Sequence, residues 1–195
     1  MNSTSKMRQR AALLSIGLVA VFVTSLTVNS FSSSASQRFA RELKSDDSSV
    51  RYKAAKQLEN LGANAHDAVE ELAMTLSDSD PKVRYRSAKA LSKIGEHAHK
   101  ALPNLIEALK DTDREVRYYT AKTLYKLGEA AEPARDAIIE ALADKDSEIR
   151  IYLVKSLKCT GENYPPAMKA VKKLESDANP KVREAVKDAI EDLRD

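Results

Sequence analysis

The feature that most constrains this chain is an internal repeat with a period of 33 residues. The stretch DPKVRYRSAKALSKIG begins at Asp80, and DREVRYYTAKTLYKLG begins one period later at Asp113. A segment that recurs at this spacing predicts one structural unit repeated along the chain, with each unit packed only on its neighbours. The clearest columns are capping residues (Asp47, Asp80, Asp113, Asp146, Asn179), aliphatic residues (Val50, Val83, Val116, Ile149, Val182), arginines (Arg51, Arg84, Arg117, Arg150, Arg183) and glycines (Gly62, Gly95, Gly128, Gly161).

Each unit contains the signals of a helical hairpin. Asp80 is placed to cap the first helix, Pro81 suits its first turn, and Gly95 is expected to end it in a left-handed conformation. A second helix is predicted from about residue 98 to 110, and a short polar turn then leads to the next unit. The residues expected to form the buried stripe of the first helix are Val83, Ser87, Leu91 and Ile94.

The predicted fold class is therefore all-α. We expect an α-solenoid, or superhelix, of 33-residue helical hairpins, because one hairpin cannot bury its apolar stripe alone. The repeats start near residues 47, 80, 113 and 146, and a capping helix starts at 179, within a repeat domain that covers 36–195.

The pattern D-x-x-V-R-x-x-x-A-x-x-x-L-x-x-x-G of the second and third units resembles HEAT repeats of the phycobilisome-lyase type. The resemblance covers about residues 45–195 and implies a fold, since such arrays serve many functions. It also implies that a recurring Asp and Arg bridge adjacent repeats. We expect bidentate pairs between the arginine column and a second acidic column, Asp78, Asp111, Asp144 and Asp177.

Residues 1–35 differ in composition from the repeats. Lys6, Arg8 and Arg10 precede the uncharged run AALLSIGLVAVFVTSLTV, and a Ser-rich stretch follows it. This order predicts a signal peptide or a signal-anchor helix, followed by a linker. Either outcome places the repeat domain outside the cytoplasm, in a periplasmic or other extracytoplasmic location. Secretion after cleavage and single-pass anchoring both remain open.

Composition argues against several function classes. A net charge of +3 does not suggest a nucleic-acid partner, and the single Cys159 excludes an internal disulfide. The hydroxylases of the HEAT-like group hold a di-iron centre with His-Glu pairs, but His66, His97 and His99 form no such dipeptide. No feature suggests a bilin pocket. We predict no enzyme activity, no catalytic, cofactor-binding or metal-binding residues, and no cofactor.

Two surfaces are candidates for a partner. The first helices present Tyr and Lys columns as an exposed ridge, and the second helices present a face whose charge changes from acidic to basic along the chain. The expected function is a non-catalytic scaffold that binds another protein. The alternatives are an enzyme subunit related to bilin lyases or hydroxylases, and a binder of anionic membrane surfaces. A solvated structural role for the ridge is a further alternative. The candidate partner-binding residues are Tyr52, Lys56, Tyr85, Lys89, Tyr118 and Lys122 on the ridge, and Glu70, Met74, Asn104, Glu107, Asp136, Glu140 and Lys173 on the second helices.

Overall fold

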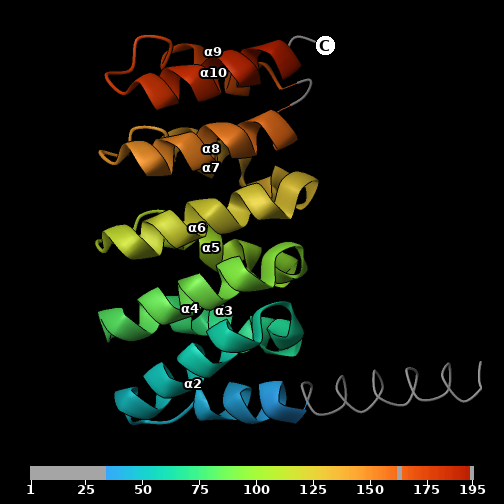
Figure 1. The fold of residues 1–195 in the computed structure, drawn as a ribbon, viewed down its shortest axis with the longest axis vertical. Helices are drawn as coiled ribbons and strands as arrows, with labels where there is room; N and C mark the ends of the chain where they lie inside the picture. The colour runs from blue at the N-terminus through green and yellow to red at the C-terminus, as the bar shows by residue number, and fades with distance from the viewer. Residues whose placement is uncertain (1–33, 162–163, 194–195) are drawn as a thin grey trace, which may run out of the picture.

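The computed structural model describes residues 34–161 and 164–193. These residues form helices and turns, without a strand, and stack as successive layers along the longest axis of the molecule (Figure 1). Within the described part of the chain, no helix is long and apolar enough to cross a membrane. The predicted export or anchor segment lies mostly outside the described residues, whose first helix covers 34–42.

Each layer contains one long first helix. These helices lie in chain order along the stack in Figure 1, each packed on the next. Their starts agree with the predicted repeat starts to within one residue, and the last is the predicted cap. The first helices are α2 (Ser48–Leu61), α4 (Pro81–Ile94), α6 (Arg114–Leu127), α8 (Ser147–Thr160) and α10 (Pro180–Asp192).

The second half of each hairpin differs from the single helix that the sequence predicts. In the second repeat, η3 (Gly95–Ala101) is a 3₁₀ segment, and the α-helix α5 covers only Leu102–Ala108. Ala98 and Ala101 are fully buried. Residues three apart share one face of a 3₁₀ helix, so the two alanines form its inner stripe. The other second-half elements are η1 (Gly62–Ala68), α3 (Val69–Met74) and η2 (Thr75–Ser77), then η4 (Gly128–Ala134) and α7 (Arg135–Ala141), then α9 (Pro165–Lys172).

The helix ends confirm the capping prediction but show that the expected backbone conformation of one glycine was wrong. The side chain of Asp80 accepts a hydrogen bond from the Lys82 amide at 2.8 Å, as an N-cap should. Gly95 ends α4 with φ 72°, where a side chain would be strained. Gly161 was expected to behave alike, but its φ is −95°. Glycine is required at this position because of packing, since a Cβ there would lie 2.5 Å from the Leu157 carbonyl oxygen.

One continuous core runs through all the layers. Its centre is a column of leucines from the first helices, each fully buried and one period apart. Burial of a leucine side chain contributes about 1.5–3 kcal/mol, and the period places the same contribution in every layer. The column consists of Leu58, Leu91, Leu124 and Leu157.

The predicted Asp–Arg pairs are confirmed and link the turns between repeats. The Arg84 guanidinium donates from Nε and Nη2 to the Asp111 carboxylate at 2.7 and 3.1 Å. Its Nη1 donates to the Asp78 backbone oxygen at 3.0 Å. Each such arginine therefore joins the turn before its own first helix to the turn before the next first helix, which holds adjacent units in register. The same bidentate pattern recurs at Arg51–Asp78, Arg117–Asp144 and Arg150–Asp177.

Candidate functional site

The first-helix ridge consists of Tyr52, Lys56, Tyr85, Lys89, Tyr118 and Lys122. The sequence predicts its tyrosines as exposed, and this is wrong, because all three are half-buried. Tyr85 and Tyr118 pack against the hydrophobic core. Adjacent helices lie close enough for each ring to be covered by a side chain of the next helix.

Arg86 and Glu59 connect the side chains at the N-terminal end of the ridge. Arg86 donates from Nη1 to Glu59 at 2.7 Å and from Nη2 to the Tyr52 hydroxyl at 3.0 Å. Lys89 donates to the Tyr85 hydroxyl at 3.2 Å and lies 3.1 Å from Glu59. These bonds raise the pKa of Lys89 to about 12. Burial raises the pKa of Glu59, but its bonds from Arg86 and Lys89 together outweigh this effect and lower it.

An aromatic chain continues the ridge toward the C-terminus. The Tyr118 ring contacts Tyr119 edge-on at 5.1 Å and Tyr152 at 5.5 Å between centroids. Lys122 lies over the Tyr118 and Tyr152 rings at 5.7 and 5.6 Å, within the range of a cation–π contact. Burial and the Tyr152 hydroxyl raise the pKa of Tyr118 to about 12.

Sequence reasoning missed Glu59, Arg86, Tyr119 and Tyr152 as members of this network. One signal was available, since Tyr119 and Tyr152 are one period apart. The ridge is thus a surface whose charges and hydroxyls are largely satisfied by the protein itself. Among its six residues, Lys56 is exposed to solvent and the other five are half-buried.

The second-helix face consists of Glu70, Met74, Asn104, Glu107, Asp136, Glu140 and Lys173. Asn104 is half-buried and the other members are exposed, as the sequence predicts. Met74 on α3 is 65% exposed, which is unusual for a large apolar side chain and contrasts with the buried leucines of the core. The structure places these residues on α3, α5 and α7, and at the C-terminal end of α9, so the face extends over four repeats.

Exposed contacts cross this face between neighbouring repeats. Lys100 donates to Glu70 at 2.7 Å, with both side chains more than 60% exposed. Pairs of this kind contribute at most about 1 kcal/mol and exchange readily with other charged groups. The Tyr164 hydroxyl donates to Asp136 at 2.6 Å, which raises the pKa of Tyr164. Within the described residues, no ion pair holds Glu107.

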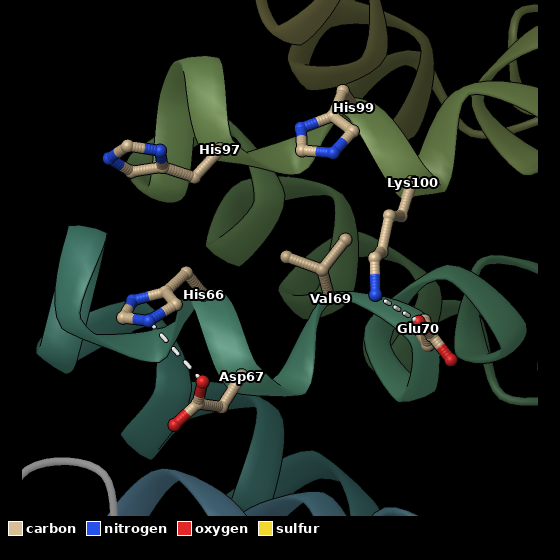
Figure 2. A pocket seen from close by; sticks show the side chains of 7 residues that line it. All are labelled: His66, Asp67, Val69, Glu70, His97, His99 and Lys100. Carbon is tan, nitrogen blue, oxygen red and sulfur yellow. Dashed lines mark hydrogen bonds and ion pairs between the residues drawn. The ribbon is translucent and has the colours of Figure 1, made fainter.

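Two open hollows lie beside the second helices. One, of about 390 Å³, is lined by Asn104 and Glu107 together with Arg84 and Asp111, one of the Asp–Arg pairs that link the turns. The other, of about 480 Å³, lies at the η1 and η3 segments (Figure 2). As the described side chains lie, no group of three or more His, Cys, Asp or Glu residues could hold a metal ion. The second hollow is lined by His66, Asp67, Val69, Glu70, His97, His99 and Lys100.

Comparison with known proteins supports the repeat architecture. The family model described as HEAT repeats matches residues 36–124 and 95–158, which together are more than half of the chain. A search of curated proteins found no match.

Solved structures show the same fold. A crystal structure of an engineered protein aligns with a TM-score of 0.69 at 23% identity, over 80% of this chain and 78% of that one. A designed armadillo repeat protein in complex with the peptide (KR)4 aligns with a TM-score of 0.68 at 17% identity, over 80% of each chain. The complex of CpcE and CpcF of phycocyanin lyase from Nostoc sp. aligns with a TM-score of 0.65 at 25% identity, over 81% of this chain and 64% of that one.

Proposed function

The chain belongs to the HEAT-repeat family, and we propose from this premise that it is a non-catalytic scaffold that binds another protein along its second-helix face. The architecture is suited to protein interaction, because a stack of helices offers a long surface that one partner can follow over several repeats. The observation that carries the proposal is the exposure of this face, where Met74 and a row of charged side chains lie open to solvent.

The order of charges on the face defines the chemistry of the partner. Glu107, Asp136 and Glu140 form an acidic stretch on α5 and α7, and Lys173 follows at the end of α9. A complementary partner is an extended segment with basic side chains opposite α5 and α7 and an acidic residue opposite α9. An apolar residue would contact Met74. Charge complementarity of this kind favours the correct partner and register more than it adds affinity.

A solved neighbour illustrates such a ligand. The designed armadillo repeat protein was crystallised with the basic peptide (KR)4. At 17% identity the likeness concerns the fold alone. It supports the proposal only in showing that a stack of this architecture can be bound by a basic peptide.

The experiment compares charge reversal on the two surfaces. Full-length chain is used to capture partners, which are identified by mass spectrometry and tested as purified proteins. We expect Glu107→Lys with Glu140→Lys to weaken binding of the identified partner at least tenfold. The matched control, Lys56→Glu with Lys155→Glu, reverses two exposed charges on the first helices and should change binding less than twofold. Equal losses in both variants, or a loss only in the control, would refute the assignment of this face.

A lyase-type enzyme subunit is the second candidate, favoured by the likeness to the phycocyanin lyase complex. Its test is an absorption spectrum and a metal analysis of the purified protein. A bound tetrapyrrole or bound iron would replace the scaffold proposal. A colourless protein without iron agrees with the scaffold.

Export of the repeat domain is part of the proposal and rests on the N-terminal sequence pattern. Fractionation followed by N-terminal sequencing tests both location and cleavage. A mature chain that starts near Ser36 indicates secretion, and an intact chain in the membrane fraction indicates anchoring. An intact chain found only in the cytoplasm would refute export. Binding to anionic vesicles that disappears on reversal of Lys56, Lys89 and Lys122 would favour a membrane-surface function instead.

A further inference from the structure

All three histidines of the chain line the same hollow between the first two repeats. His66 belongs to η1, and His97 and His99 belong to η3 one repeat later. Figure 2 shows the His66 and His97 rings on one side of the hollow, tilted by 58° to one another, with His99 on the other side near Lys100. This meeting of separate histidines is decided by the stacking of the repeats.

The hydrogen bonds of His66 fix the role of each ring nitrogen. Nδ1 lies 3.1 Å from the backbone oxygen of Ala63. A carbonyl oxygen only accepts, so Nδ1 carries the hydrogen of this bond. Nε2 lies 3.3 Å from an Asp67 carboxylate oxygen. With the hydrogen on Nδ1, the lone pair of Nε2 is the one that a metal ion can use.

The same distances suit a metal ion. Zn²⁺ bonds to imidazole nitrogen and carboxylate oxygen are about 2.0–2.2 Å, so two tetrahedral ligands of one zinc lie about 3.3–3.4 Å apart. The distance of 3.3 Å from His66 Nε2 to Asp67 matches this separation. The bond from Nδ1 to a backbone oxygen is also the usual way in which a metal-binding histidine is oriented.

His97 is placed to supply a third ligand. Its ring centroid lies 6.0 Å from that of His66. Two imidazoles on one tetrahedral zinc ion have centroids about 5.2 Å apart, because each centroid is about 3.2 Å from the metal. The His97 ring therefore has to approach His66 by slightly less than 1 Å, about the difference between 6.0 Å and this separation. The His97 side chain is 56% exposed, so rotation of the ring toward His66 displaces only water. In its present orientation its Nε2 lies 3.9 Å from Glu96, an exposed carboxylate that competes weakly.

We propose that His66, Asp67 and His97 form a binding site for a divalent metal of the class that prefers imidazole, with Zn²⁺ as its representative. The site closes by rotation of His97, since no three such side chains among the described residues hold a metal as they lie. Water completes the coordination. Two imidazoles and one carboxylate select zinc, copper or nickel over calcium or magnesium, which prefer all-oxygen sites.

The remaining charged groups of the hollow stay outside the site. Glu70 is engaged by Lys100 at 2.7 Å. The Lys100 ammonium repels a second cation, and His99 lies on its side of the hollow (Figure 2). The bound metal therefore connects η1 to η3 and links the first repeat to the second at the edge opposite the Asp–Arg turns.

The test is calorimetric titration of ZnCl₂ into metal-free full-length protein at pH 7.5 in mild detergent. A Cys159→Ser background removes the thiol as a ligand. We expect one zinc per chain. His66→Ala and His97→Ala should each weaken binding at least tenfold, and Asp67→Asn about tenfold. His99→Ala is the matched control, because it removes a histidine of the same hollow, and it should change the affinity less than twofold.

A second readout is thermal unfolding. Zinc should raise the melting temperature of the parent protein and of His99→Ala, and should leave that of His97→Ala unchanged. Circular dichroism verifies that the variants fold, and His66→Gln replaces His66→Ala if the latter does not. The absence of saturable binding, an equal loss in His99→Ala, or several equivalent weak sites would each overturn the proposal, the last by showing an adventitious ion only.

Discussion

The first-helix ridge and the second-helix face both carry charged columns at 33-residue spacing, but they use these charges differently. On the ridge, Lys89 and Arg86 both bond to Glu59 of the preceding first helix, Arg86 also bonds to the Tyr52 hydroxyl of that helix, and Lys89 to the Tyr85 hydroxyl of its own helix. On the second-helix face, Glu70 is held only by an exposed pair, and Glu107 has no ion pair within the described residues. A charged column therefore indicates a binding surface only where the protein has not already satisfied its charges.

The largest expected difference between the first helices and the second helices concerns apolar side chains. Leu91 is fully buried and Met74 is 65% exposed. We expect Leu91→Ala to lower the free energy of unfolding by about 2–5 kcal/mol, because it leaves a cavity in the core. Met74→Ala should change it by less than about 0.5 kcal/mol. Urea unfolding followed by circular dichroism measures both free energies. Similar losses in the two variants would contradict the assignment of Leu91 to the core and of Met74 to the exposed face.

Ion pairs of the same chemistry should differ according to burial. The Arg117 and Asp144 side chains are 10% and 7% exposed, whereas those of Lys100 and Glu70 are above 60%. Arg117→Met leaves a buried carboxylate without its bidentate partner and should lower the free energy of unfolding by about 3 kcal/mol. Lys100→Met should leave the free energy of unfolding nearly unchanged, because this pair is exposed to solvent.

The same urea experiment compares these variants. A control with both Arg117→Met and Asp144→Leu should recover part of the loss, because no charge is then buried. An undiminished loss in this double variant would show that packing, and not the charge, is responsible.

Alkaline pH should weaken the ridge. The pKa of Tyr118 is about 12 in the folded protein, against about 10 in an unfolded chain. Because the folded pKa is the higher one, the stabilisation from the neutral hydroxyl is complete below pH 10. It is lost as the pH rises through 12. Absorbance at 295 nm should show late-titrating phenols, because the pKa values of Tyr119 and Tyr164 are raised as well, and their amplitude should fall in Tyr118→Phe. A single transition near pH 10 for all tyrosines would contradict the half-buried ridge.

The smallest expected effect concerns Tyr164 at the edge of the second-helix face. Its hydroxyl donates to the exposed Asp136. Tyr164→Phe removes one solvent-exposed hydrogen bond and should lower the free energy of unfolding only slightly. Urea unfolding measures this, with Asp136→Asn as the companion variant. A loss as large as that of Leu91→Ala would place this contact in the core.

Much of the fold could be predicted, because repetition makes local signals add up. The caps at Asp80 and its equivalents, the buried leucines and the Asp–Arg pairs all follow from residues that recur in every unit. The 3₁₀ segments could not be predicted in this way. Their cause is the spacing of small alanines against a neighbouring repeat, and this contact has no signature within a single helix. Gly161 was misjudged for a similar reason, since its surroundings include Ala167 and Leu193.

The candidate surfaces were predicted less completely than the fold. The period correctly separates the two helix faces, and the exposure of Glu70, Met74 and Glu107 agrees with it. The burial of the ridge tyrosines was missed, because each ring is covered by a side chain of the next first helix: Tyr52 by Arg86, Tyr85 by Tyr119 and Tyr118 by Tyr152. That the second-helix face binds another protein remains a prediction.

The amino-acid sequence by itself determined that this chain is a stack of helical hairpins, because caps, glycines and apolar spacing act within one unit and are copied along the chain. Only the tertiary structure decided which charges are satisfied and which are free, and it alone brought His66 next to His97. These outcomes depend on contacts between side chains about one period apart, whose distances are set by the packing of neighbouring repeats and not by any local preference of the backbone.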